Sequence, residues 1–275
     1  MNTMSTTLVS SHSLIYRIAV FVYGVTAYVI GVAALLALIL TMLGVLPFTG
    51  VPLGSLGFGA GLTLDALLLV VFALQHSVMA RTSFKERWTR LIPAAAERST
   101  YVLATGLALA PMLALWQPMP NVVWLIEAPI LRWCVLGVAF AGWAYLFAAS
   151  FAINHFELFG LRQVYQALRG RPLTEVPFQE RWMYRFDRHP IMTGVLIGLW
   201  ATPTMTLDHL LFAAGSTLYV WVGVFFEERS LQRQWGTEYE DYRERVSTIV
   251  PTFASWRSTS ALRAAPAVSR TDKRS

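Results

Sequence analysis

Residues 18–43 read IAVFVYGVTAYVIGVAALLALILTML and contain no charged residue and no histidine. A helix needs roughly 20 consecutive apolar residues to cross a lipid bilayer, so this stretch predicts a membrane-spanning helix near residues 16–43. The whole chain has a similar character: it is 55% hydrophobic and 14% charged, whereas about a quarter of the residues in an ordinary soluble domain are charged. The composition therefore indicates an integral membrane protein.

Further uncharged runs follow along the chain, and each predicts another membrane helix. The first run extends without a charge from Ile18 to Leu64, which is too long for one helix, and the prolines and glycines between residues 47 and 61 indicate a loop inside it. The sequence ATPTM at residues 201–205 separates the last two predicted helices. The helices are expected near residues 16–43, 62–81, 99–116, 132–153, 190–203 and 208–227. The predicted fold is all-α, a polytopic membrane bundle of five to six transmembrane segments whose last two form a short helical hairpin.

The distribution of charge predicts the orientation of these helices. If the N-terminus is inside and the segments alternate, every Lys and Arg except Arg132 falls on one face, while Asp65, Glu127 and Asp208 fall on the other. Loops on the cytoplasmic side of membrane proteins carry an excess of Lys and Arg. We therefore expect both termini to be cytoplasmic, in a bacterial inner membrane. The net charge of +6 is explained by this topology, and no nucleic-acid partner is expected.

The predicted organisation is one membrane-embedded domain over residues 1–255, followed by a basic tail, residues 256–275. The tail is rich in Ser, Ala and Arg, a composition typical of disordered segments. The single cysteine, Cys134, lies in an apolar predicted helix, where a buried and unreactive thiol is expected. No pair of His or Cys residues has the spacing of metal ligands, so no metal site is expected.

Polar residues gather at the cytoplasmic ends of four predicted helices. Polar groups inside membrane segments are costly and are therefore candidates for function. Their concentration at one interface predicts a charged site capped by the membrane, although residues of this kind also commonly mark the membrane boundary. The residues at the four ends are Gln75, His76, Asn154, His155, Arg188, His189, Pro190, Glu227 and Glu228.

The densest group of these residues lies in YRFDRHPIMTG, residues 184–194. Pro190 suits the first turn of a helix, so the positive end of the helix dipole would face the cytoplasm beside Arg188 and His189 and favour a ligand carboxylate or phosphate. Gly194 and Gly198 are about one turn apart, which allows close approach of a neighbouring helix or of a flat ligand. Glu227 and Glu228 could accept hydrogen bonds from ribose hydroxyls or a ligand amine, or could be an exposed helix end.

An amphipathic helix is predicted beyond the last membrane segment. In QRQWGTEYEDYRERV, residues 232–246, helical spacing places Trp235, Tyr239, Tyr242 and Val246 on one face and the charges on the other. This pattern indicates a cytoplasmic surface helix that lies either on the membrane or over the site.

These segments carry a family resemblance. RHPIMTG at residues 188–194, EE at 227–228 and WGTEYEDYRERV at 235–246 resemble the pattern of the isoprenylcysteine carboxyl methyltransferase superfamily, whose members are integral-membrane methyltransferases that use S-adenosylmethionine. Four more segments are similar to the methanethiol S-methyltransferase family, which converts methanethiol to dimethyl sulfide. They are FALQHSVMART (72–82), PAAAERSTYVL (93–103), NHFELFGLRQVY (154–165) and WATPTMTLDHLLFA (200–213).

The resemblance implies a cofactor, S-adenosylmethionine, and the residues that hold it. Met192 stands where the wider superfamily often has Tyr, so a contact by that hydroxyl is not expected. The implied cofactor-binding residues are Tyr184, Arg188, His189, Pro190, Gly194, Glu227, Glu228, Tyr239 and Tyr242. The implied partners are a small thiol substrate and membrane lipid.

A base is the remaining requirement of thiol methylation, because a free thiol is mostly protonated near neutral pH; even Cys has a pKa of about 8.5. We expect His76 to act as this base, oriented by Gln75, with Asn154 and His155 as second choices. Two other interpretations remain open. The acceptor could be lipid-linked, an isoprenylcysteine carboxylate or a phospholipid amine, or the protein could be a non-enzymatic transporter or membrane partner.

Overall fold

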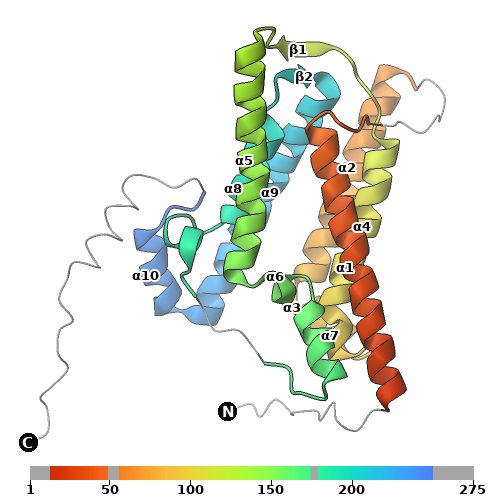
Figure 1. The fold of residues 1–275 in the computed structure, drawn as a ribbon, viewed down its shortest axis with the longest axis vertical. Coiled ribbons are helices and arrows are strands. Elements are labelled where there is room, and N and C mark those ends of the chain that lie inside the picture. The colour runs from red at the N-terminus through yellow and green to blue at the C-terminus, as the bar shows by residue number, and fades with distance from the viewer. Residues whose placement is uncertain (1–12, 49–55, 175–178, 250–275) are drawn as a thin grey trace, which may run out of the picture.

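The computed structural model describes residues 13–48, 56–174 and 179–249. Its helices run along the long axis of the molecule, and a small sheet lies at one end (Figure 1). In chain order the elements are α1 (Leu14–Met42), α2 (Phe58–Ala80), α3 (Thr82–Trp88), η2 (Ala94–Ala96), α4 (Glu97–Leu115), β1 (Val122–Leu125), α5 (Pro129–Ile153), α6 (His155–Leu158), α7 (Leu161–Leu168), η3 (Trp182–Arg185), α8 (Pro190–Trp200), β2 (Thr204–Thr206), α9 (Leu207–Trp235) and α10 (Thr237–Arg245).

The helices α1, α2, α4, α5 and α9 are long and apolar enough to cross a membrane. The predicted all-α polytopic bundle is therefore confirmed. Helix α8 is also apolar but has 11 residues. At 1.5 Å per residue it is about 16 Å long, roughly half the hydrocarbon thickness of a bilayer.

The observed helix ends lie within four residues of the predicted ones, with one exception: α9 runs to Trp235 and not to residue 227. The prediction stopped where the hydrophobic run stopped, but EERSLQRQW consists largely of good helix formers, which continue the helix into the polar region. The helix ends before Gly236, whose φ of +55° is a conformation that favours glycine. Glu227 and Glu228 consequently lie inside α9 and do not close it.

Two packed groups of helices make up the bundle. Helix α4 packs against α1 and α2, and α5 packs against α8. The two groups share a buried core that contains Trp116, Trp143, Leu199 and Phe212. Burial of such large apolar side chains stabilises a fold by about 25 cal/mol for each Å² removed from water. The core therefore holds α8 and α9 at a fixed position beside α1 and α4.

The end of the bundle where α5 and α9 begin is capped by the two-stranded antiparallel sheet of β1 and β2 (Figure 1). Its register pairs Trp124 with Met205 and Leu125 with Thr204. No strand is predicted from the sequence here, because segments of three and four residues are too short for an alternating pattern to be recognised.

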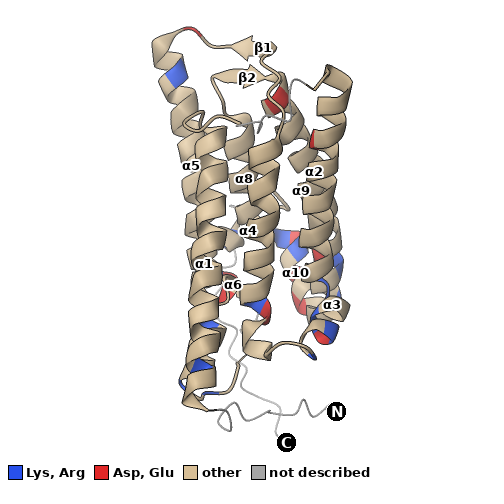
Figure 2. Cartoon of the chain, turned by 90° about the vertical axis from the view of Figure 1, so that its right-hand side faces the viewer, with Lys and Arg blue, Asp and Glu red and all other residues tan. Residues whose placement is uncertain are grey.

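Charge is distributed unevenly between the two ends of the bundle. Lys and Arg gather at the end that contains α3 and α10, and few lie near β1 and β2 (Figure 2). The polar residues predicted to form a site belong to the basic end, because α2, α5 and α9 run toward it and α8 starts from it.

The structure also bears on the predictions for Cys134 and for the C-terminal tail. Cys134 was expected to be buried, but it is exposed on the outer surface of α5. A helix that faces lipid is apolar on all sides, so composition alone does not show which side faces the bundle. The predicted disordered tail, residues 256–275, lies outside the described residues.

Candidate active site

The site is built on the segment that leads into α8. Residues 186–188 run beside the chain that follows α10: the Arg188 N–H donates to the Ser247 carbonyl at 2.9 Å, and the Ser247 hydroxyl donates to the Phe186 carbonyl at 2.8 Å. Pro190 is the first residue of α8, where its missing N–H costs no hydrogen bond. The RHP segment is thus held between α8 and the C-terminal part of the described chain.

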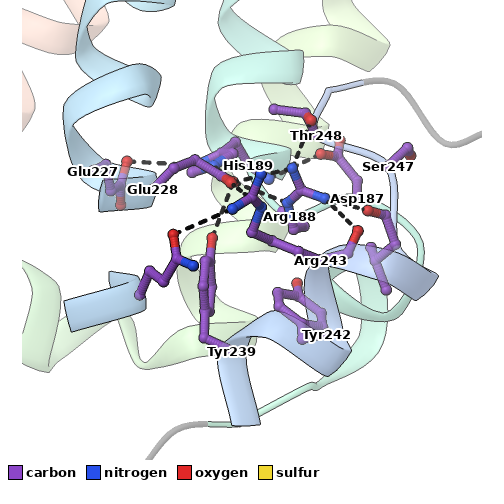
Figure 3. Close-up of polar contacts among 12 residues, drawn as sticks. Asp187, Arg188, His189, Glu227, Glu228, Tyr239, Tyr242, Arg243, Ser247 and Thr248 are labelled. Atoms are coloured by element: carbon purple, nitrogen blue, oxygen red, sulfur yellow. Dashed lines mark hydrogen bonds and ion pairs between the residues drawn. The ribbon is translucent and has the colours of Figure 1, made fainter. Parts of the chain in front are cut away.

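Arg188 forms a two-pronged ion pair with Glu228 (Figure 3). Its Nε donates to Oε1 at 2.9 Å and its Nη2 to Oε2 at 3.2 Å. The same guanidinium also donates to the Val246 carbonyl at 2.6 Å, the Arg243 carbonyl at 2.9 Å and the Thr248 hydroxyl at 2.7 Å. The Arg188 side chain is only 8% exposed, so it acts as a clamp that joins α8, α9 and α10.

Glu228 is the carboxylate on which these elements converge. Besides Arg188, it receives the Tyr239 hydroxyl at 2.9 Å and His189 Nε2 at 2.8 Å, and Arg243 Nε lies 3.3 Å away. Its side chain is 13% exposed. Such charge-assisted hydrogen bonds are shorter and stronger than neutral ones, so Glu228 organises the site and has little capacity left for a ligand.

His189 lies between the two glutamates of α9. Its Nε2 contacts Glu228, its Nδ1 lies 3.4 Å from Glu227 Oε2, and its side chain is 4% exposed. Burial alone would lower the pKa of His189, but the hydrogen bonds and negative charges of Glu227 and Glu228 outweigh that effect and raise its pKa to about 9. At neutral pH the imidazole is therefore a buried cation.

Glu227 differs from its neighbour because half of its side chain, 50%, is exposed. Its charge acts on three tyrosines from different elements: Tyr101 of α4, Tyr184 of η3 and Tyr239 of α10. Burial and the nearby carboxylates raise the pKa of Tyr184 and of Tyr239, so both hydroxyls stay protonated. Glu227 can therefore offer exposed oxygens to a ligand from a position fixed by His189.

Helix α10 covers the site, which decides between the two positions predicted for it. Tyr239, Tyr242 and Val246 are buried in one cluster with Leu231 and Trp235. The Tyr242 hydroxyl donates to the Tyr184 carbonyl at 2.6 Å. The aromatic face predicted from the sequence thus packs against the end of α9 and contacts η3.

Asp187 is a site residue to which the sequence analysis gave no role. It is fully buried, and its Oδ1 accepts the His189 N–H at 2.9 Å. The Thr193 and Tyr145 hydroxyls also hydrogen-bond to this carboxylate, yet burial outweighs them and raises the pKa of Asp187. An acidic residue just before a helix start was the signal available in YRFDRHPIMTG, because a carboxylate there complements the helix dipole.

Gly194 serves the packing of α8 on α5. A Cβ at this position would lie 2.6 Å from the Gly142 carbonyl oxygen and 2.7 Å from the Leu146 nitrogen. Of the two interpretations of the Gly194 and Gly198 pair, helix packing is the one with contacts in the structure, since the ring of Trp143 fills the space beside Gly198.

A cavity of about 370 Å³ borders the cluster on the α9 side. Its polar wall contains Arg188, Glu228 and Arg243, and its apolar wall contains Trp221 and Phe225. The volume lies within the range of about 300 to 1,000 Å³ that is typical of small-molecule pockets.

His76 occupies a separate polar cluster between α2, α4 and α9. The Tyr101 hydroxyl is 2.7 Å from its Nε2, and the Thr105 hydroxyl is 3.1 Å from its Nδ1. Gln75 was expected to orient this ring, but its amide Nε2 instead donates to Met79 Sδ at 3.2 Å. Neighbouring side chains of a helix point in different directions, so the orienting residues come from α4.

Asn154 and His155 have contacts typical of structural residues. Asn154 has a φ of 120° and caps α6 by accepting the Glu157 N–H at 3.2 Å. His155 is buried, with its Nδ1 2.9 Å from the Ser150 hydroxyl and its Nε2 3.0 Å from the Tyr28 hydroxyl. Burial lowers the pKa of His155. The structure does not bring these second-choice residues into the cluster of His189 and Glu227.

Among residues 13–48, 56–174 and 179–249, no group of three or more His, Cys, Asp or Glu side chains could hold a metal ion. The charged cluster instead consists of two glutamates, two arginines and a protonated histidine closed by tyrosines. Such a set of groups offers both negative and positive partners for hydrogen bonds and ion pairs. The fold and this cluster define an integral-membrane helical protein with a buried charged cluster at the basic end of its bundle.

Known proteins match most of the chain. A methanethiol S-methyltransferase of Mycobacterium tuberculosis is 50% identical over 193 residues, which cover 70% of this chain and 79% of the relative. The methanethiol S-methyltransferase 1 of Bradyrhizobium diazoefficiens is 41% identical over 240 residues, 87% of this chain and 84% of the relative. The chain belongs to the methanethiol S-methyltransferase family and is a methyltransferase.

More distant similarity reaches eukaryotes. A Nurim homolog of Drosophila pseudoobscura pseudoobscura is 34% identical over 176 residues, 62% of this chain and 70% of that protein. No protein-family model and no solved structure matches the chain.

Proposed function

We propose that this protein methylates methanethiol to dimethyl sulfide with S-adenosylmethionine as methyl donor, at the cytoplasmic face of a bacterial inner membrane. Its similarity to methanethiol S-methyltransferases supports the reaction, and the observation that carries the choice of donor is the half-exposed Glu227 beside a buried, protonated His189.

The residues of the site fit this donor. S-adenosylmethionine presents ribose hydroxyls, an ammonium group, a carboxylate and a sulfonium cation. Glu227 would accept hydrogen bonds from the hydroxyls or the ammonium group, and Arg243, whose side chain is 43% exposed, would pair with the carboxylate. The exposed aromatic faces of Trp221 and Phe225 line the adjoining cavity, and aromatic faces attract cations.

The clamp formed by Arg188 and Glu228 would hold the binding residues in place for the donor. It joins α8, α9 and α10 before any ligand binds, so Glu227 and His189 need little rearrangement to meet the donor. When bound, S-adenosylmethionine supplies an electrophilic methyl group on a sulfonium sulfur, which a thiolate sulfur can attack in line. Holding the two partners about 3 to 3.5 Å apart is itself a large part of catalysis.

His76 remains our proposed base for the thiol. Its cluster lies on the α9 side of α2: the Ser77 hydroxyl donates to the Tyr219 hydroxyl at 3.3 Å, and Arg81 lies 4.3 Å from the centroid of the Phe226 ring, next to Glu227. The charge of Glu227 reaches Tyr101, the hydrogen-bond partner of His76. The proposed acceptor cluster therefore lies within the electrostatic range of Glu227, the exposed carboxylate of the proposed donor site.

The experiment that tests this function is calorimetric titration of detergent-purified protein with S-adenosylhomocysteine, followed by headspace detection of dimethyl sulfide after addition of methanethiol and S-adenosylmethionine. Binding and the volatile product are expected. Binding without dimethyl sulfide would discard the thiol, and no binding would discard the donor. Glu227→Gln should weaken binding by about tenfold or more, the size of a lost charged hydrogen bond, while Glu238→Gln on the exposed face of α10 should not.

The proposed orientation has its own test. In a Cys134→Ser background, Ser83→Cys on α3 should react with a membrane-impermeant maleimide only after the cells are opened. Ala128→Cys, at the β1–β2 end, should react in intact cells. The opposite pattern would place the basic end outside the cytoplasm.

A further inference from the structure

Both ring nitrogens of His76 already have hydroxyl partners from α4. The Tyr101 hydroxyl lies 2.7 Å from Nε2 and 3.1 Å from Nδ1, and the Thr105 hydroxyl lies 3.1 Å from Nδ1. A neutral imidazole has one N–H and one lone pair. With the proton on Nδ1 and donated to Thr105, the Nε2 lone pair faces the Tyr101 hydroxyl at 2.7 Å, so a thiol cannot reach that lone pair without passing this group.

The His76 ring is held in place by its surroundings. It stacks on Phe72 with ring centroids 5.5 Å apart, and Tyr219 of α9 approaches edge-on with a centroid distance of 6.2 Å. The centroid of Tyr101 lies 5.0 Å away. His76, Tyr101 and Tyr219 are each partly buried, so the packing of the cluster fixes the orientation of the imidazole.

Tyr101 is the member of this cluster that connects it to the charged site. Its charged and titratable neighbours come from two elements: Glu97 and Arg98 at the start of its own helix α4, and Tyr219 and Glu227 of α9. Glu227 also acts on Tyr184 and Tyr239 of the charged cluster. The charge of one carboxylate thus acts on both the charged cluster and Tyr101.

We propose that Tyr101 is a catalytic residue that carries the proton of the acceptor thiol to His76, an inference that rests on the proposed function. The S–H proton moves to the Tyr101 oxygen while the Tyr101 proton moves to the facing nitrogen of His76. The sulfur keeps the S–H bonding pair and forms the new C–S bond with it. The C–S bond of the sulfonium donor breaks and returns its pair to the donor sulfur, which leaves two neutral thioethers and an imidazolium.

A hydroxyl suits this position because it can accept one proton and donate another in the same step. The Tyr101 side chain regains its starting state once His76 gives up the added proton. Threonine at residue 105 would hold the ring in the orientation that presents a lone pair to Tyr101, a positioning role.

The test is Tyr101→Phe in the full-length detergent-purified protein, with dimethyl sulfide formation measured at pH 6.5 and pH 8.5 under saturating donor. General acid–base catalysis contributes about 10²- to 10⁴-fold, so we expect a loss of about 100-fold or more at pH 6.5. The variant can use only preformed thiolate, whose concentration rises about 50-fold between these pH values for a thiol with a pKa of about 8.5. Its activity relative to the unchanged protein should therefore recover by about tenfold or more at pH 8.5.

Both pH values lie below the pKa of His189, which is about 9, so most of this imidazole stays protonated in the assay. Tyr23→Phe is the matched control, because the Tyr23 hydroxyl donates at 2.8 Å to Thr100, the residue before Tyr101 on the same helix. This control should keep its activity at both pH values. Tyr101→Phe should bind S-adenosylhomocysteine with the unchanged Kd.

An equal loss at both pH values, or no loss, would overturn the role of Tyr101 while leaving the proposed function standing. Absence of dimethyl sulfide from the unchanged protein would overturn both. If Tyr101→Phe does not bind S-adenosylhomocysteine, a proton inventory of the unchanged protein decides: a curved dependence of rate on the D₂O fraction supports two protons in motion, and a straight line contradicts it.

Discussion

Glu228→Gln should be the most destabilising conservative change at the site. It removes the negative charge on which Arg188, His189 and Arg243 converge, and the first two of these side chains are nearly fully buried. Removing one partner of a buried ion pair typically costs 3 to 5 kcal/mol. For a chain of this size each kcal/mol corresponds to about 3 °C, so the unfolding temperature should fall by about 10 °C.

The pH dependence of stability should change in the same variant. The pKa of His189 is about 9 in the folded chain and about 6.5 when unperturbed, a difference worth about 3 kcal/mol. Because the folded-state pKa is raised, this stabilisation is fully present below pH 6.5 and is lost as the pH rises through 9. With Glu228 neutral, His189 loses one of its two carboxylates, so the loss of stability between pH 6.5 and 9.5 should be smaller in Glu228→Gln.

The assay is thermal unfolding of the detergent-purified protein across that pH range, with Glu238→Gln as the control for loss of an exposed carboxylate on the neighbouring helix. Comparing the two variants cancels the contribution of groups elsewhere in the chain. An unfolding temperature of Glu228→Gln equal to that of Glu238→Gln, or an identical pH dependence in the two variants, would refute the assignment of Glu228 as the organising carboxylate.

Two further predictions concern packing around the site. Gly194→Ala should destabilise the protein, because its Cβ would lie 2.6 Å from the Gly142 carbonyl oxygen, whereas Gly137→Ala on the open side of α5 should have no such effect; thermal unfolding compares them, and equal midpoints would contradict the packing role. Tyr242→Phe removes the 2.6 Å hydrogen bond to the Tyr184 carbonyl and should lower the free energy of unfolding by about 1 to 3 kcal/mol. An unchanged denaturation midpoint would show that α10 is held over the site by apolar contacts alone.

Much of the fold could be read from the chain because a bilayer imposes strict requirements. Backbone groups in hydrocarbon must be satisfied within a helix, so uncharged runs such as residues 18–43 predict spanning helices and their approximate ends. The asymmetry of Lys and Arg between loops likewise predicts which helix ends lie together. For this reason the residues Arg188, His189, Glu227 and Glu228 could be assigned to one interface before the structure was known.

Where hydrophobicity is not the determinant, the prediction was incomplete. Helix α9 continues for nine residues beyond its apolar run, because helix propensity and not burial sustains it there. Cys134 was placed inside the bundle and lies outside it. In a membrane, the side of a helix that faces lipid is as apolar as the side that faces its neighbours, so the direction of a side chain depends on packing.

The sequence alone determined that this protein is a polytopic membrane bundle of this methyltransferase family with a charged group of residues at one end. Only the tertiary structure decided which partners each of these residues contacts and which of them stay exposed. In the folded chain Glu228 forms an ion pair with Arg188, whereas the side chain of Glu227 is half exposed, although the two glutamates are adjacent and chemically identical. The tertiary structure also paired His76 with Tyr101 and not with Gln75. These pairings depend on which helices pack against each other. Contacts between residues that are distant in the chain follow from the packing of the whole bundle.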